Sequence, residues 1–466
     1  MIRLAMIAVL LGLTAFAIAN PVSLGREDIA RAWLRLEREL RESPPRPADR
    51  ARLGAQFDVK TRAFFHGGFG EVVRGIDSIT AELRGTSADA GPTAFALAFS
   101  VEVDPPVWVI GKSKEAKLSG GPIYDVEIAD EALAKLRLRL LGPDGTTRWE
   151  MPIRKAGLST TLSLSPTGLA PGRHEFRIVG PDGIDEPAGR LPVLTEPPDV
   201  TRRRNEKRIA ALPEDAPTQA LATVRARNGL LVPRPVRSYG WLRDPHELAK
   251  EVDEEIHALE KGKDPYVGRA GDHWRVVDVK GGTVPYRIFV PKDLGGKPAP
   301  LVFFLHGAGA DENAFFEGYG LGIARELAAK RKFIAVAPKT IPVARKAGVF
   351  TTLLDTVLAG HDIDESRIYV VGHSLGAFAT GFLCRAHGDR IAAACQIAGG
   401  TGRTGDKGPP VLFVHAGRDQ ILHLTAPEES ALVTVRRYPD EAHTWVVPAA
   451  LPGILDWVFE HSRPKK

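Results

Sequence analysis

The stretch IYVVGHSLG at residues 368–376 decides the fold of the C-terminal part of the chain. Its first four residues are typical of a buried strand, and AFATG at residues 377–381 is small enough to begin a helix packed on a sheet. Glycines stand on both sides of Ser374 because larger side chains would clash in so sharp a turn from strand to helix. The pattern therefore predicts a serine hydroxyl held above the sheet as a nucleophile.

Residues 272–466 alternate strands with helical stretches, which predicts a mostly parallel sheet flanked by helices. Several of the strands are continuous apolar runs, as expected where helices cover both faces of the sheet. A closing helix is predicted at Pro452–His461. The predicted strands are Trp274–Val279, Tyr286–Val290, Leu301–Leu305, Phe333–Ala337, Arg367–Val371, Ile391–Ile397, Val411–His415 and Val433–Tyr438.

A second motif, LHGAG at residues 305–309, directly follows one of these strands. Acyl transfer builds negative charge on a carbonyl oxygen, and backbone N–H groups must already point at that oxygen. The residue after the nucleophile, Leu375, is expected to supply one donor and Ala308 the other, with Gly307 as the alternative. His306 is expected to brace this loop rather than to act as a base.

The remaining groups follow in chain order. Asp419 comes just after the buried strand 411–415, where a carboxylate can orient an imidazole and stabilise its charged form. His443 comes after the last strand and before the closing helix, which is the place that the order Ser, acid, His requires for the base. Asp440 is the alternative acid and His415 the alternative base.

With these four landmarks in order, residues 272–462 resemble the α/β-hydrolase superfamily. Within it, the unit is similar to secreted esterases of the feruloyl esterase, polyhydroxybutyrate depolymerase and dienelactone hydrolase groups. The resemblance implies hydrolysis of a carboxylic ester through an acyl-enzyme, with no metal and no organic cofactor. Ala308 stands where depolymerase-like relatives often carry Cys, which argues against a polymer such as theirs, so a small-molecule or polysaccharide-linked ester is expected as the substrate.

The spacing of the predicted triad leaves no room for a large helical cap between its members. The site is therefore expected to be open, or covered only by the preceding domains. Aromatic side chains near the two loops are candidates for an apolar substrate pocket, although packing in the core explains them equally well. These residues are Phe315, Phe316, Tyr319 and Trp445.

The N-terminus has the features of a cleavable signal peptide at residues 1–19. Arg3 precedes an apolar run at residues 4–18, and Ala17 and Ala19 form a small-x-small cleavage pattern. The mature protein is thus expected to be secreted or periplasmic, and not attached to a membrane after cleavage.

Three further segments precede the hydrolase unit. Residues 20–91 are predicted to be helical, with an apolar stripe in the first helix and Asp49 as the cap of the second. Residues 92–198 carry about seven short strands separated by turns, which predicts an immunoglobulin-like β-sandwich with a strand at Phe95–Val103. Residues 199–271 are expected to form a partly helical linker.

Composition argues against nucleic-acid binding and limits the role of disulfides. The 466-residue chain has 62 basic and 57 acidic side chains, interleaved to a net charge of +5, so nucleic-acid binding is not expected. Cys384 and Cys395 are the only two cysteines. They are expected on a helix and on the following strand, and two buried free thiols are favoured over one disulfide.

Two other functions fit parts of the sequence. A serine peptidase of the prolyl-oligopeptidase type would use the same triad, but about a hundred residues of strand are too few for several four-stranded propeller blades. A surface or polysaccharide-binding protein with an inactive hydrolase domain would use the sandwich instead. The complete set of Ser, acid, His and oxyanion donors argues against an inactive domain. The sequence does not indicate the oligomeric state.

Overall fold

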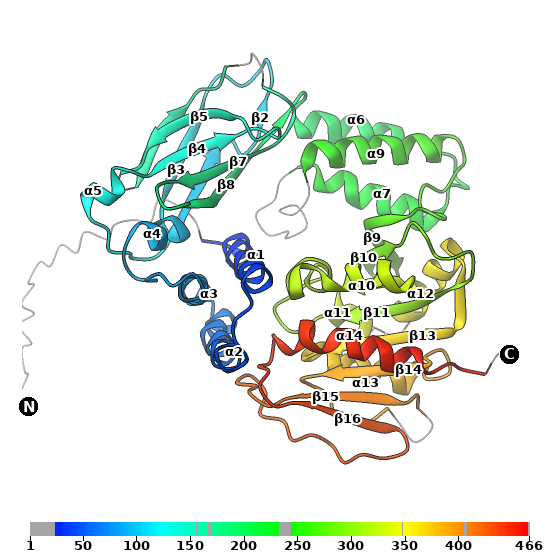
Figure 1. Cartoon of the computed structure of the whole chain (residues 1–466). Coiled ribbons are helices and arrows are strands. Elements are labelled where there is room, and N and C mark those ends of the chain that lie inside the picture. The colour runs from blue at the N-terminus through cyan, green and yellow to red at the C-terminus, as the bar shows by residue number, and fades with distance from the viewer. Residues whose placement is uncertain are drawn as a thin grey trace, which may run out of the picture.

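The computed structural model describes residues 24–464 except 155–156, 166–168, 233–243, 347 and 405–407. The predicted signal peptide lies outside the described residues. Figure 1 shows a β-rich unit, a set of N-terminal helices and a C-terminal unit built on one large sheet. Within the described part of the chain, no helix combines the length and the hydropathy needed to cross a membrane.

The C-terminal unit contains an eight-stranded sheet in the order β16-β15-β14-β13-β11-β12-β10-β9. Strand β10 pairs antiparallel with both of its neighbours, and the other pairings are parallel. The predicted strands are all present, with ends that differ by a few residues. They are β9 (Gly271–Val279), β10 (Gly282–Val290), β11 (Ala299–Leu305), β12 (Ile334–Pro338), β13 (Ile363–His373), β14 (Ala393–Ile397), β15 (Val411–Ala416) and β16 (Val433–Tyr438).

Two hydrophobic clusters cover the two faces of this sheet, and β11 contributes alternate side chains to each. Val302 and Phe304 pack with α10 (Ile323–Arg331) and α14 (Val446–Phe459). Leu301, Phe303 and Leu305 pack with the helices of the other face. Those helices are α11 (Thr340–Arg345), α12 (Val349–Gly360) and α13 (Leu375–His387). Because successive strand residues point to opposite faces, a strand covered on both sides must be apolar throughout.

The closing helix begins earlier than predicted. Helix α14 starts at Val446 and contains Pro452 in its interior, whereas the prediction began the helix at that proline. The apolar stripe of α14 packs against the sheet on both sides of the proline. Burial of this stripe outweighs the backbone hydrogen bond that a proline inside a helix removes.

The N-terminal segment is helical, as its apolar periodicity indicates. Its elements are α1 (Arg26–Glu42), α2 (Pro47–Thr61), the 3-10 helix η1 (Arg62–His66), α3 (Phe69–Leu83) and α4 (Pro92–Ala98). Two details of the prediction are wrong. Arg46 occupies the N-cap position of α2, without a capping hydrogen bond from its side chain. Asp49 lies in the first turn, because Pro47 already occupies the first helical position.

The second error concerns the run Phe95–Val103, which was predicted as one strand. Its first four residues belong to α4, and the strand β1 begins at Phe99. Pro92 stands at the start of this helix, and three alanines favour helical backbone. The apolar residues of α4 are buried, and Phe95 and Ala96 belong to the same cluster as the strands, so a buried helix and a buried strand had the same apolar pattern.

Ahead of the C-terminal unit, the residues that the structure describes form eight strands in two sheets. Their bounds are β1 (Phe99–Asp104), β2 (Trp108–Val109), β3 (Ala116–Pro122), β4 (Arg137–Leu141), β5 (Thr147–Pro152), β6 (Leu158–Leu162), β7 (Gly172–Val179) and β8 (Asp185–Leu194). One sheet has the order β1-β3-β6 and the other β2-β8-β7-β4-β5. Both sheets contribute side chains to one hydrophobic cluster. Classification of this unit as immunoglobulin-like stays a prediction.

Between this unit and the large sheet, the described residues form three helices: α6 (Pro198–Ala210), α7 (Thr218–Leu230) and α9 (Pro245–Glu260). They pack on each other and on Trp274 and Val276 of β9. Arg227 of α7 is completely buried, and it donates from Nε to Glu255 Oε2 at 2.9 Å and from Nη1 to the carbonyl oxygen of Trp274 at 3.1 Å. This segment is thus a packed group of helices with its own core.

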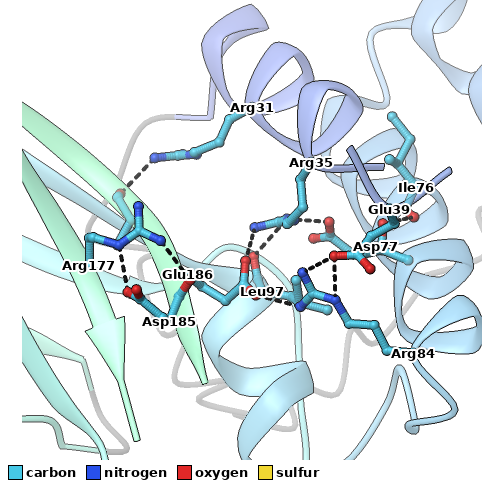
Figure 2. A network of polar contacts seen from close by, with 12 residues as sticks. Arg31, Arg35, Glu39, Ile76, Asp77, Arg84, Leu97, Arg177, Asp185 and Glu186 are labelled. Atoms are coloured by element: carbon cyan, nitrogen blue, oxygen red, sulfur yellow. Dashed lines mark hydrogen bonds and ion pairs between the residues drawn. The ribbon is translucent and has the colours of Figure 1, made fainter. Parts of the chain in front are cut away.

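A buried network of charged side chains joins the N-terminal helices to the eight-stranded N-terminal unit (Figure 2). Arg35 of α1 forms an ion pair with Asp77 of α3, and its Nη1 lies 3.6 Å from Glu186 Oε2 of β8. Arg84 also binds Glu186 and donates to Glu39 of α1 at 2.5 Å. These ion pairs fix α1 and α3 against β8.

The two cysteines are free and buried, one on α13 and one on β14, as predicted. Burial raises the pKa of the Cys384 thiol to about 12. Such a thiol stays protonated and unreactive at neutral pH.

Candidate active site

Ser374 lies in a strained turn between β13 and α13. Its φ is 54° and its ψ is −117°, outside the regions that non-glycine residues ordinarily adopt. A Cβ added at Gly372 would lie 2.1 Å from the Gly376 carbonyl oxygen, and one added at Gly376 would lie 1.9 Å from the Leu305 carbonyl oxygen. The two glycines are therefore required for the close approach of strand, turn and helix. The turn holds Ser374 at the carboxyl end of the central strand β13.

Asp419 and His443 are paired beside this serine. Asp419 Oδ2 lies 2.7 Å from His443 Nδ1, and both side chains are almost fully buried. Asp419 Oδ1 accepts backbone N–H bonds from Ile421 and Leu422, each at 2.7 Å, which fixes the carboxylate. With its Nδ1 proton directed at the carboxylate, the neutral imidazole has Nε2 as its acceptor nitrogen. Ser374 and His443 line the same cavity.

The alternative bases are engaged elsewhere. His306 Nε2 accepts from the Thr340 backbone N–H at 3.1 Å, and its Nδ1 lies 2.8 Å from the Gly307 carbonyl oxygen. Burial lowers the pKa of His306, which keeps the ring neutral in this bracing position. His415 Nε2 lies 3.0 Å from the carbonyl oxygen of Leu424. The structure thus brings together Ser374, Asp419 and His443, and their catalytic roles remain part of the proposal below.

Both predicted oxyanion donors border the serine. Leu375 is the first residue of α13, so its N–H has no acceptor within the helix. Gly307 and Ala308 line the cavity from the loop after β11. A Cβ added at Gly307 would lie 3.2 Å from the Ser374 Cβ, which shows how closely this loop approaches the nucleophile.

His373, next to the serine, is a site residue that the sequence did not reveal. Its Nε2 lies 2.9 Å from the carbonyl oxygen of His443, and its Nδ1 lies 2.9 Å from the Tyr319 hydroxyl. A neutral ring satisfies both contacts by donating from Nε2 and accepting the tyrosine proton at Nδ1. Burial, together with the nearby His443, holds the pKa of His373 well below its usual range. His373 therefore positions the backbone of the candidate base.

Asp58 of helix α2 holds the same backbone from the other side. Its Oδ2 accepts N–H bonds from His443 at 2.8 Å and from Gln420 at 3.1 Å. Within the described part of the chain, its Oδ1 is buried and makes no hydrogen bond. Burial raises the pKa of Asp58 to about 6. Asp58 thus ties the acid loop and the base loop together.

Glu37 of helix α1 makes a similar contact with a third loop. Its Oε1 accepts from Trp33 Nε1 at 2.9 Å, and its Oε2 accepts from the Gly320 N–H at 3.1 Å. Burial raises the pKa of Glu37 to about 7. Gly320 adjoins Tyr319, the partner of His373, so this contact also supports the site.

A cavity of about 220 Å³ opens at the serine. Of the four predicted pocket residues, only Tyr319 lines it. Phe315 stacks on Phe304 with ring centroids 5.0 Å apart, and Phe316 lies in the same buried cluster. Trp445 packs 6.1 Å from the Phe57 ring, in the core of the N-terminal helices.

The pocket prediction is therefore wrong for Phe315, Phe316 and Trp445, because neighbouring elements cover all three side chains. Most of the apolar lining comes instead from α1, η1, α2 and α3, which the sequence did not place at the site. Among the described residues, no group of three or more His, Cys, Asp or Glu side chains could hold a metal ion.

No family model and no curated protein sequence matches the chain. Several solved structures resemble parts of it at low identity. An S-formylglutathione hydrolase from Staphylococcus aureus is 13% identical and covers 41% of this chain and 99% of its own, with a TM-score of 0.33. A putative dienelactone hydrolase from Klebsiella pneumoniae is 17% identical and covers 41% and 98%, with a TM-score of 0.31. A thermostable esterase is 19% identical and covers 78% and 100%, with a TM-score of 0.34.

The strand order and the site identify the fold independently. The nucleophile turn follows β13, and the loop that approaches it follows β11, the third strand of this unit in chain order. Asp419 follows β15 and His443 follows β16, the last strand of the sheet in chain order. This arrangement of a strained serine turn, an oxyanion loop and a paired acid and base matches the expected landmarks. The C-terminal unit has the α/β-hydrolase fold.

Proposed function

We propose that the protein is a secreted serine esterase that cleaves carboxylic esters through an acyl-enzyme intermediate. The observation that carries the proposal is that Asp419 Oδ2 lies 2.7 Å from His443 Nδ1 and that His443 lines the same cavity as Ser374. The substrate would be a small-molecule ester or an ester linked to a polysaccharide, and the reaction would need no cofactor. Residues 1–19 would direct export from the cytoplasm and would then be cleaved off.

The chemistry follows from the geometry. The Ser374 hydroxyl oxygen attacks the ester carbonyl carbon while His443 Nε2 takes its proton, and Asp419 stabilises the imidazolium. The N–H groups of Leu375 and Ala308 stabilise the negative charge on the carbonyl oxygen. The imidazolium then protonates the departing alcohol, and a water activated by His443 hydrolyses the acyl-enzyme to release the acid.

The domain division is part of the proposal. It comprises a helical segment at residues 20–91, an immunoglobulin-like sandwich at 92–198, a partly helical linker at 199–271 and the catalytic unit at 272–466. The packing of α1 and α2 against the catalytic loops supports a direct role for the first segment in the site.

Hydrolysis of 4-nitrophenyl esters tests the reaction class. We expect turnover by the intact protein and a loss of about 10⁴-fold or more in kcat for Ser374→Ala, with unchanged folding by circular dichroism. Val59→Phe, on an exposed position of α2, is a matched control that should retain activity. A folded protein without turnover on any ester would favour a peptidase or a binding protein, and cleavage of chromogenic peptides would then separate these two.

A further inference from the structure

We infer that the N-terminal helices form the wall of the active site that binds the hydrocarbon chain of the substrate. The substrate is then an ester with a hydrocarbon chain of about six or more carbons. This inference rests on the proposed function. It assigns specificity to residues 26–76, outside the catalytic unit.

The two sides of the cavity differ in chemistry. The catalytic unit contributes the nucleophile, the base and the oxyanion loop. The facing wall is built by Ile29, Trp33 and Leu34 of α1, Phe57 of α2 and Ile76 of α3. A wall of aliphatic and aromatic side chains beside reacting polar groups suits a hydrocarbon chain attached to an ester.

Two polar side chains of the same wall already make hydrogen bonds within the protein. The Thr61 hydroxyl donates to the Phe57 carbonyl oxygen at 2.8 Å. The Arg26 guanidinium donates to the Gly309 carbonyl oxygen of the oxyanion loop. The wall therefore favours a hydrocarbon chain over a sugar, whose hydroxyl groups would lose their hydrogen bonds to water.

The cavity is larger than a short acyl group needs. A volume of 220 Å³ corresponds to the space of roughly seven water molecules. An acetyl group would leave most of this space to water, whereas a longer chain would displace that water. Each methylene buried in this way should raise kcat/KM by about fourfold until the cavity is filled.

The wall is fixed on both sides. The Phe64 ring lies so close to Gly309 that a Cβ added there would be 2.5 Å from it, and Arg50 donates to Glu441 at 2.8 Å. Trp445 of the catalytic unit belongs to the core of the N-terminal helices. On the far side, the Arg35 network binds the same helices to β8 (Figure 2). The helices are thus a built part of the pocket.

Two series of esters test the inference. In one, the acyl chain of a 4-nitrophenyl ester runs from acetate to decanoate; in the other, the alcohol of an acetate ester runs from methyl to octyl. We expect kcat/KM to rise at least tenfold with chain length in one series, and that series identifies which side of the ester occupies the pocket. The same ratio of longest to shortest ester is then measured in two variants.

Ala30→Phe places a ring in the cavity from a partly exposed position of α1, and Val59→Phe adds the same ring on α2 at a side chain that is 52% exposed and outside the cavity lining. We expect Ala30→Phe to lower the ratio at least tenfold, while Val59→Phe keeps the ratio of the unmodified protein. Thermal melting checks that both variants are folded. A flat chain-length profile in both series, or a ratio that Ala30→Phe leaves unchanged, would overturn the inference while esterase activity stands. Absence of activity on every ester would overturn the proposed function itself.

Discussion

The contact between Asp58 and the base loop allows a quantitative prediction for Asp58→Asn. Asp58 is fully buried, and burial raises its pKa from 3.8 to about 6. This rise corresponds to about 3 kcal/mol of unfolding free energy. Because the folded pKa lies above the unfolded pKa, this stability is fully present below about pH 4. It is lost as the pH rises through 6, when the buried carboxylate must ionise.

Asparagine keeps an oxygen for the N–H groups of His443 and Gln420, but it never ionises. Its amide NH₂ would take the place of Oδ1, which makes no hydrogen bond within the described structure, so the variant loses about 1–3 kcal/mol at every pH. Relative to the unmodified protein, the variant should therefore be less stable at pH 4. The difference in unfolding free energy should shift in favour of the variant by about 3 kcal/mol between pH 4 and pH 7.

The esterase activity of Asp58→Asn should fall at high pH, where its stability relative to the unmodified protein improves. An ionised acceptor makes stronger hydrogen bonds than an amide oxygen, and the difference is about 1–1.5 kcal/mol for a bond that holds the base in position. We expect kcat/KM at pH 8 to fall roughly tenfold, and the loss of rate below pH 6 to become less steep because one titrating group has been removed.

Urea unfolding of both proteins from pH 4 to pH 8 measures the shift, and 4-nitrophenyl ester hydrolysis measures the rate. Glu37, whose burial raises its pKa to about 7, contributes a dependence of the same sign, but it is present in both proteins and cancels in the difference. Stability curves that run parallel over this pH range would refute the reasoning, because they would show that Asp58 is not the buried titrating group.

Two further substitutions test other parts of the framework. Tyr319→Phe removes the hydroxyl that lies 2.9 Å from His373 Nδ1. This substitution should lower kcat/KM about five- to tenfold with little change in KM. An unchanged kcat would show that His373 does not need the hydrogen bond from Tyr319. Arg35→Ala leaves the buried Asp77 and Glu186 without this partner and should lower the unfolding free energy by about 3–5 kcal/mol, as measured by urea denaturation. A loss below 1 kcal/mol in that variant would mean that water replaces the guanidinium.

The sheet and the serine turn could be predicted because their signals are local. Each strand of the catalytic unit is a short apolar run between turn residues, and the glycines around Ser374 follow from the sterics of the turn itself. The candidate acid and base could then be chosen because they follow the last two strands in the order Ser, acid, His. Errors arose where a local pattern had two solutions, as in α4, whose buried apolar residues resembled those of a strand.

The supports of the site could not be predicted because they depend on contacts between distant segments. Asp58 is 385 residues from His443, and an isolated Asp within an amphipathic helix looks like any solvent-facing residue. The basic residues that follow it, Lys60 and Arg62, suggest an ordinary surface ion pair, whereas its actual partners are backbone N–H groups. The same reason explains Phe315 and Trp445, whose role depended on which element would cover them.

These supports explain how a catalytic unit without a cap of its own obtains a walled pocket. Only 24 residues separate Asp419 from His443, too few for an inserted helical cap. The N-terminal helices supply the missing wall, and two of their carboxylates accept N–H groups from the loops that carry Tyr319, Asp419 and His443. Burial of Asp58 and Glu37 opposes ionisation, so folding alone would favour uncharged side chains at both positions. Their presence is best explained by the catalytic loops: a charged acceptor holds a backbone N–H more firmly than a neutral one, at the points where the candidate base must not move.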